Sequence, residues 1–298
     1  MSPATDPARR LAEIRAAAER MLRDARSRAY RRWERIGADA DRTIDVLTGV
    51  PVVDGPIEQF RHAGATLIAE QRGDTASDTT FVLVHGIGMG RKVFADLTHR
   101  LQSHGLVIAV DQPGYGEAPE PKRTPTMART ADLLAAYLRH IDRGPVVLIG
   151  HSMGAQVAVE TAARHPELVA RLVLVAPTVD PRARRARTQL WRLGVDLLDE
   201  SPKVLLLGAR EYLRAGPHLR RKMRAMLVHR PEDALGAITA PTLVMRGEHD
   251  PVSPRPWCEQ IVAGVADAKL YEVPGRGHET LIRDAAPAAS VIVGDDER

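Results

Sequence analysis

A serine between two glycines is the residue of this 298-residue chain best suited to do chemistry. Ser152 lies in the run Gly-His-Ser-Met-Gly at 150–154, directly after apolar residues 146–149 and directly before an Ala/Val-rich helical pattern. We expect a strand, a very tight turn and a helix, because Gly150 and Gly154 have no Cβ atoms to obstruct such a turn. The helix would direct backbone N–H groups and the positive end of its dipole toward Ser152. The pattern predicts a nucleophilic serine.

A serine hydroxyl attacks well only when a base removes its proton, so a histidine and an orienting acid must lie elsewhere in the chain. His278 follows the expected strand at 269–273, and Asp250 follows an apolar run that starts at 241. Both residues therefore lie on loops just after strands, as Ser152 does. Asp180 follows another strand and is the alternative acid. We prefer Asp250 because a glycine and a proline frame it in a tight loop.

Other histidines lie close to these residues in the sequence. His249 precedes Asp250 and should point the opposite way along the loop. We expect His85 and His151 to support loop geometry rather than transfer protons. No set of histidine and acidic residues has the spacing of a metal site, so we expect neither a metal nor another cofactor.

Apolar runs alternate with helical patterns over most of the chain. We expect strands at 57–62, 65–70, 80–84, 106–110, 146–149, 171–175, from 241 and at 269–273, and helices up to about 103, at 126–141, after Ser152 and at 286–293. Strands separated by helices imply an α/β fold with a mostly parallel sheet flanked by helices. Ligands bind such sheets beyond the carboxyl ends of the strands, where the candidate residues fall.

The order Ser152, Asp250, His278, with the serine in a Gly-x-Ser-x-Gly turn, resembles the α/β-hydrolase superfamily, in particular its lid-bearing, serine-dependent esterases and lipases. The resemblance extends from about residue 57 to 293. It implies that Ser152 is the nucleophile, His278 the base and Asp250 the acid. The segment His-Gly-Ile-Gly at 85–88 resembles the oxyanion-hole segment, whose donors would be the N–H groups of Ile87 and Met153.

The resemblance also narrows the reaction. Dehalogenases and epoxide hydrolases of the superfamily would have aspartate at position 152, whereas serine indicates esters, thioesters, lactones, some amides or carbon–carbon bonds next to a ketone. Hydrolysis of an ester, thioester or related acyl bond through an acyl-enzyme is our leading interpretation. Perhydrolases and acyltransferases with the same triad are the first alternative. A non-catalytic homologue that binds a partner is the second, although an intact triad argues against it.

Residues 178–236 interrupt the alternation and are expected to form a helical lid between two halves of the core, at 57–177 and 237–298. Positions 180–235 hold thirteen Lys and Arg against seven acidic residues. A positive lid could attract an anionic acyl group or a phosphate-bearing carrier. The alternative, which we favour, is that these charged side chains lie on a helix face exposed to solvent. Apolar residues of this segment would line a pocket for a small-molecule acyl substrate, so the substrate could be anionic or apolar.

Residues 1–56 are expected to form a basic helical arm and a linker outside the resemblance. Apolar residues recur at helical spacing through 8–36, a segment that contains ten arginines and four acidic residues. We expect this stripe to pack on the hydrolase domain or on a second copy of the chain. The alternative is a peripheral membrane contact. Nucleic-acid binding is not expected, because no recognition motif accompanies the charge.

Composition is typical of a globular protein, with 44% hydrophobic and 27% charged residues and a net charge of +4. No apolar run reaches the roughly 18 residues of a membrane span, and the N-terminus has no hydrophobic signal segment. Cys258 is the single cysteine, so an internal disulfide is impossible. These features favour a cytoplasmic protein.

Overall fold

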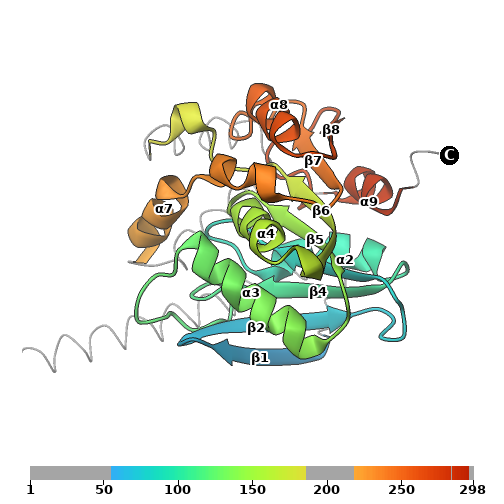
Figure 1. Cartoon of the computed structure of the whole chain (residues 1–298). Helices are drawn as coiled ribbons and strands as arrows, with labels where there is room; N and C mark the ends of the chain where they lie inside the picture. The colour runs from blue at the N-terminus through green and yellow to red at the C-terminus, as the bar shows by residue number, and fades with distance from the viewer. Residues whose placement is uncertain (1–54, 186–217, 283, 295–298) are drawn as a thin grey trace, which may run out of the picture. The chain divides into compact units, whose positions relative to one another are not determined.

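A computed structural model of the protein describes residues 55–185, 218–282 and 284–294. Their centre is an eight-stranded sheet in the order β1-β2-β4-β3-β5-β6-β7-β8 (Figure 1). The strands are β1 (Ile57–His62), β2 (Ala65–Arg72), β3 (Thr80–Val84), β4 (Leu106–Asp111), β5 (Val146–His151), β6 (Val169–Val175), β7 (Thr242–Gly247) and β8 (Ala268–Val273). Strand β2 pairs antiparallel with β1 and β4, and all other neighbours are parallel. The predicted α/β fold class is confirmed.

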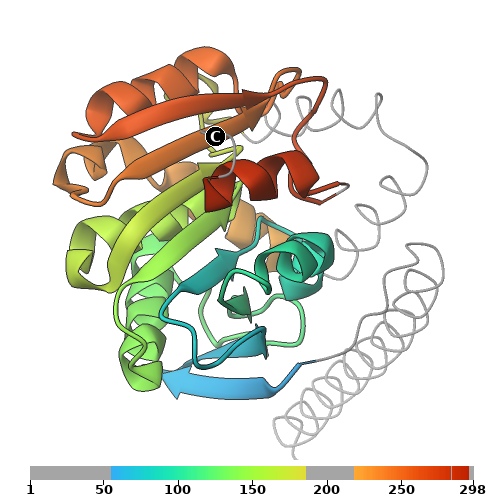
Figure 2. The same ribbon diagram turned by 90° about the vertical axis from the view of Figure 1, so that its right-hand side faces the viewer.

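Two layers of helices cover the sheet, because successive strand residues point to opposite faces. The helices are α2 (Ala95–Leu101), α3 (Met127–Ile141), α4 (Met153–Arg164), α7 (Leu219–Val228), α8 (Arg255–Gly264) and α9 (Ala286–Val293). Apolar residues of α3, α4 and α8 share one core cluster with Val82 and Leu148, and those of α2 and α9 share a second cluster with Leu83 and Ile149. Figure 2 shows the sheet between these layers.

Several expected elements appear with the expected limits. The hairpin of β1 and β2 turns at Ala63 and Gly64, both with positive φ, which suits a two-residue turn between antiparallel strands. Helix α3 begins after Thr126, whose hydroxyl accepts a hydrogen bond from the N–H of Arg129. Helix α8 has no counterpart in the sequence-based expectations.

The remaining segments are only partly described. Within 178–236, the described parts are 3-10 turns at Pro181–Ala183, Pro231–Asp233 and Leu235–Ala237 together with α7. The predicted arm at 8–36 and most of the predicted lid lie outside the described residues, so the proposed domain limits stay predictions. None of the described helices is both long enough and apolar enough to cross a membrane.

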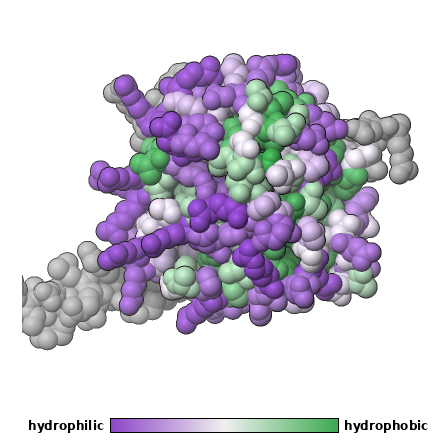
Figure 3. Space-filling view, viewed as in Figure 1, coloured by the Kyte–Doolittle hydropathy of each residue, from purple (hydrophilic) through white to green (hydrophobic). Residues whose placement is uncertain are grey.

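One face of the described residues is mainly hydrophilic. On the face seen in Figure 3, hydrophilic side chains predominate and hydrophobic ones are scattered among them. Of the large hydrophobic side chains that the structure describes, Ile57 and Val228 are the exposed ones. Single exposed apolar residues of this kind are normal and need no partner.

Candidate active site

Ser152 lies at a sharp turn between β5 and α4, as the sequence predicts. Its φ of 54° and ψ of −118° fall in a region of backbone conformation that residues other than glycine rarely adopt. The N–H of Ser152 donates to the carbonyl oxygen of Val175 at 2.9 Å, which fixes the turn to the neighbouring strand. A Cβ atom on Gly154 would lie 2.1 Å from the carbonyl oxygen of Val84, so this position requires glycine. The strained turn holds the hydroxyl at the carboxyl edge of the sheet.

Ser152, His278 and Asp250 form one continuous hydrogen-bonded chain. The Nε2 atom of His278 lies 3.0 Å from Oγ of Ser152, and its Nδ1 atom lies 2.9 Å from Oδ2 of Asp250. All three residues are at most 6% exposed. Residues at positions 152, 250 and 278 thus meet at the ends of three different strands, β5, β7 and β8.

The carboxylate of Asp250 is held in its charged form. Burial alone would raise its pKa, but His278 and the N–H groups of Ser253 and Val252 together lower it below its usual value. These N–H groups donate to Oδ1 at 2.9 and 2.8 Å. Since a carboxylate only accepts hydrogen bonds, Nδ1 of His278 carries the proton. In the neutral ring Nε2 is then the acceptor, and it lies 3.0 Å from the Ser152 hydroxyl.

Asp180, the other candidate acid, and His249, which precedes Asp250 in the sequence, have partners of their own. Oδ1 of Asp180 accepts hydrogen bonds from the backbone N–H and Nε of Arg182, at 3.0 and 3.1 Å. The side chain of His249 is 67% exposed and lies 3.9 Å from a carboxylate oxygen of Glu248. The side chain of His249 is thus exposed, whereas Asp250 is buried.

The segment at 85–88 is held by a set of buried hydrogen bonds. Nδ1 of His85 donates to the carbonyl oxygen of Gly86 at 2.7 Å, and its Nε2 accepts from the N–H of Gln112 at 3.1 Å. The side-chain amide of Gln112 donates to the carbonyl oxygen of His85 at 2.7 Å. Burial lowers the pKa of His85, so its ring stays neutral. Ile87 follows His85 and Gly86, which these hydrogen bonds hold in place. Met153 is the first residue of α4, and the first N–H groups of a helix have no partner within the helix.

Two side chains that support the site were not singled out from the sequence. Gln112 lies in the segment 111–116, which resembles a structural segment of the superfamily. Arg246, at the end of β7, donates to the carbonyl oxygens of Asp250 and Ser253 at 3.0 and 2.8 Å and so fixes the loop that carries the acid. An arginine inside an apolar strand is the sequence signal that could have indicated such a role.

His151 connects the serine turn to the histidine loop. Its Nε2 atom lies 3.0 Å from the carbonyl oxygen of His278 and must donate to it, because a carbonyl only accepts. Burial, together with the nearby His278, lowers the pKa of His151 to about 4. The ring is therefore neutral and supports the loop rather than titrating near neutral pH.

The buried neutral His151 should make the protein less stable as the pH falls from 6.5 to 4. In the unfolded chain the imidazole binds a proton below about pH 6.5, whereas the folded chain resists protonation until about pH 4. The loss from this group should reach about 3 kcal/mol at pH 4. Urea denaturation of the wild type and His151→Gln across this range measures it. Glutamine retains a donor without titrating, so its free energy of unfolding should fall less; equal slopes would contradict the assignment.

Comparison with known proteins identifies the family of this chain. A family profile described as the alpha/beta hydrolase family matches residues 81–291. The chain belongs to this family. It is 32% identical over 141 residues to 2-(acetamidomethylene)succinate hydrolase of Mesorhizobium japonicum, a match that covers 47% of this chain and only 50% of that protein. It is also 29% identical over 235 residues to pimeloyl-(acyl-carrier protein) methyl ester esterase of Chromobacterium violaceum, over 67% and 87% of the two chains.

Solved structures of the alpha/beta hydrolase family share the same architecture. The enol-lactonase of Burkholderia xenovorans matches with a TM-score of 0.68 and 20% identity, over 81% of this chain and 100% of that chain. At this identity the likeness establishes the fold alone. The protein is thus an α/β-hydrolase, and its own site residues must indicate its chemistry.

Proposed function

We propose that this α/β-hydrolase cleaves a carboxylic ester or related acyl bond through an acyl-enzyme formed on Ser152. The observation that carries the proposal is the hydrogen-bonded chain from Ser152 through His278 to the charged Asp250. This chain supplies a nucleophile, a base that can accept its proton, and an anion that stabilises the protonated base. A non-catalytic homologue would have no need for all three groups in contact.

Each residue has a defined role in the proposed reaction. Nε2 of His278 takes the proton of Ser152 as Oγ attacks the acyl carbon, and the carbonyl oxygen becomes an oxyanion. The N–H groups of Ile87 and Met153 donate to this oxyanion, a contribution of about 3–4 kcal/mol per donor in acyl transfer. His278 then gives its proton to the departing alcohol. In the second half, water loses a proton to His278, attacks the acyl-enzyme and releases the acid and free Ser152.

The relatives support an acyl bond as the substrate. By name, the esterase of Chromobacterium violaceum acts on a methyl ester, and the structural relative from Burkholderia xenovorans acts on an enol lactone, which is a cyclic ester. A thioester has the same electrophilic carbon and remains within the proposed class. We therefore propose an ester or lactone first and a thioester second.

A fluorophosphonate probe should label wild-type protein at Ser152. The probe phosphonylates only a serine whose hydroxyl is activated, as His278 would do here, and fluoride is released. Intact-mass and peptide mass spectrometry measure the adduct, with Ser152→Ala expected to prevent it. Ser103→Ala is the matched control, because this exposed hydroxyl only donates to the carbonyl oxygen of Arg100. Undiminished labelling of Ser152→Ala would reject the proposed nucleophile.

A further inference from the structure

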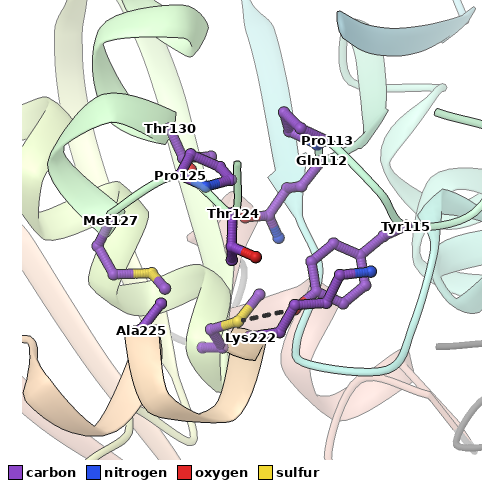
Figure 4. Close-up of a pocket in the computed structure, with 10 residues that line it drawn as sticks. Gln112, Pro113, Tyr115, Thr124, Pro125, Met127, Thr130, Lys222 and Ala225 are labelled. Atoms are coloured by element: carbon purple, nitrogen blue, oxygen red, sulfur yellow. Dashed lines mark hydrogen bonds between the residues drawn. The ribbon is translucent and has the colours of Figure 1, made fainter. Parts of the chain in front are cut away.

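A small cavity lies beside Met153, the residue that follows the candidate nucleophile. Side chains of Tyr115, Thr124, Met127, Met153, Lys222 and Ala225 line it, from the loop after β4, the start of α3, the start of α4 and α7 (Figure 4). The space open to the centre of a water molecule is about 20 Å³. One water needs roughly 10–15 Å³ by this measure, so the cavity admits a group of only a few atoms.

Lys222 contributes an alkyl wall to the cavity rather than a free charge. Its side chain is 3% exposed, and its ammonium group lies 2.8 Å from Oε2 of Glu120. The same ammonium donates to the carbonyl oxygen of Gly114 and lies 4.3 Å from the centre of the Tyr115 ring. These partners neutralise the charge and occupy its donors.

The other polar side chains of the cavity wall also have partners, with one exception. The hydroxyl of Tyr115 lies 3.6 Å from Sδ of Met153, and the amide of Gln112 donates to His85. Oγ1 of Thr124 is buried and makes no hydrogen bond with any residue that the structure describes. Figure 4 shows this hydroxyl in the space between Gln112 and Lys222. A buried hydroxyl without a partner is rare in proteins and indicates that something else hydrogen-bonds to it.

We propose that this cavity receives the end of a short, uncharged acyl group, and that Thr124 donates a hydrogen bond to an ether, hydroxyl or carbonyl oxygen of that group. The inference rests on the proposed function. Met153 supplies its N–H to the proposed oxyanion hole and its side chain to the cavity wall, so the acyl chain of a bound ester begins beside the cavity. Met127 and Met153 are flexible side chains that can adjust the space to a few atoms.

An anionic acyl group does not fit this cavity. A carboxylate would lie among apolar side chains with one neutral hydroxyl as its donor, and burying a charge without a counter-charge is costly. Lys222 could compensate it only by giving up Glu120, which would then be the unpaired charge. The cavity therefore selects a neutral oxygen-bearing acyl group over both an anionic one and a purely apolar one.

The test compares p-nitrophenyl methoxyacetate with p-nitrophenyl butyrate, whose acyl groups have the same length but differ in one ether oxygen. Thr124→Val should lower the methoxyacetate-to-butyrate ratio of kcat/KM about tenfold relative to wild type, the size of one net hydrogen bond. Comparing ratios cancels the different intrinsic reactivity of the esters. Thr124→Ser retains the hydroxyl and should restore the ratio. Thr124→Ala is the second variant if valine disturbs folding, as judged by a thermal melt.

Thr161→Val is the matched control, because the buried hydroxyl of Thr161 on α4 donates to the carbonyl oxygen of Val157 at 2.8 Å and is not part of the cavity lining. Its ratio should stay within about twofold of wild type. An unchanged ratio in both Thr124→Val and Thr124→Ala would overturn the cavity proposal. So would a preference for p-nitrophenyl hemisuccinate that Lys222→Met removes, since Lys222 would then bind an anion. Absence of turnover with every ester, together with no labelling of Ser152, would instead count against the proposed function.

Discussion

Replacing Asp250 by asparagine should lower kcat/KM for an ester substrate by about 10³–10⁴-fold while the protein stays folded. The neutral amide cannot stabilise the imidazolium that forms when His278 takes the proton of Ser152. Its NH₂ group also donates to Nδ1 of His278, which places the ring proton on Nε2, the atom that must accept the serine proton. The substitution therefore removes the base as well as its stabilising charge. Initial rates with p-nitrophenyl esters measure the loss.

Asp180→Asn is the matched control for this prediction. Asp180 is also buried and also follows a strand, and its Oδ1 accepts hydrogen bonds from the backbone N–H and Nε of Arg182, whereas Oδ2 of Asp250 lies 2.9 Å from Nδ1 of His278. Thermal melts of both variants separate loss of chemistry from loss of structure. Greater loss of turnover in Asp180→Asn than in Asp250→Asn, at equal stability, would show that the acid had been assigned to the wrong residue.

The fold could be predicted from the sequence because its signals are local. Buried parallel strands are short continuous apolar runs, such as Thr80–Val84, and the expected limits of this strand are those of β3. Helix α8 was missed because Arg255–Gly264 starts with arginine and proline and buries few side chains, Trp257, Cys258 and Ile261. Its apolar face depends on packing against β7 and β8, which the sequence does not display.

The site could be predicted only in part. Ser152, Asp250 and His278 each have a local signal in a loop after a strand, and the structure brings these three residues together. Among the groups that hold them, His85 and His151 were expected from the sequence, whereas Gln112 and Arg246 were not singled out. Thr124 and Lys222 line one cavity although 98 positions separate them, and nothing local pairs them. Contacts of this kind follow from the tertiary structure alone, so sequence patterns located the candidate reacting groups but only some of their supports.

A buried arginine, Arg91, binds the carboxylate of Asp111, the last residue of β4. The side chain of Arg91 is 1% exposed and forms ion pairs with Asp111, with Glu70 at 2.9 Å and with Glu117 at 3.0 Å. Burial alone would lower the pKa of Arg91, but these carboxylates raise it above its usual value. Asp111 precedes Gln112, the residue that holds the carbonyl oxygen of His85. The cluster therefore links stability to the geometry of residues 85–88, the proposed oxyanion-hole segment.

Arg91→Met should lower the free energy of unfolding by about 3–5 kcal/mol, because it leaves the buried carboxylate of Asp111 without its counter-charge and removes one of the two arginines that pair with Glu70. Turnover should fall as well, since Asp111 would no longer fix the loop that begins with Gln112. Urea denaturation followed by tryptophan fluorescence measures the first effect, and ester hydrolysis at a temperature where the variant is folded measures the second. Arg100→Met is the control: its ion pair with Asp96 is 38% exposed on the arginine side and should cost less than about 1 kcal/mol. A loss no larger in Arg91→Met than in Arg100→Met would mean that the carboxylates find other partners, and the support assigned to Arg91 would be wrong.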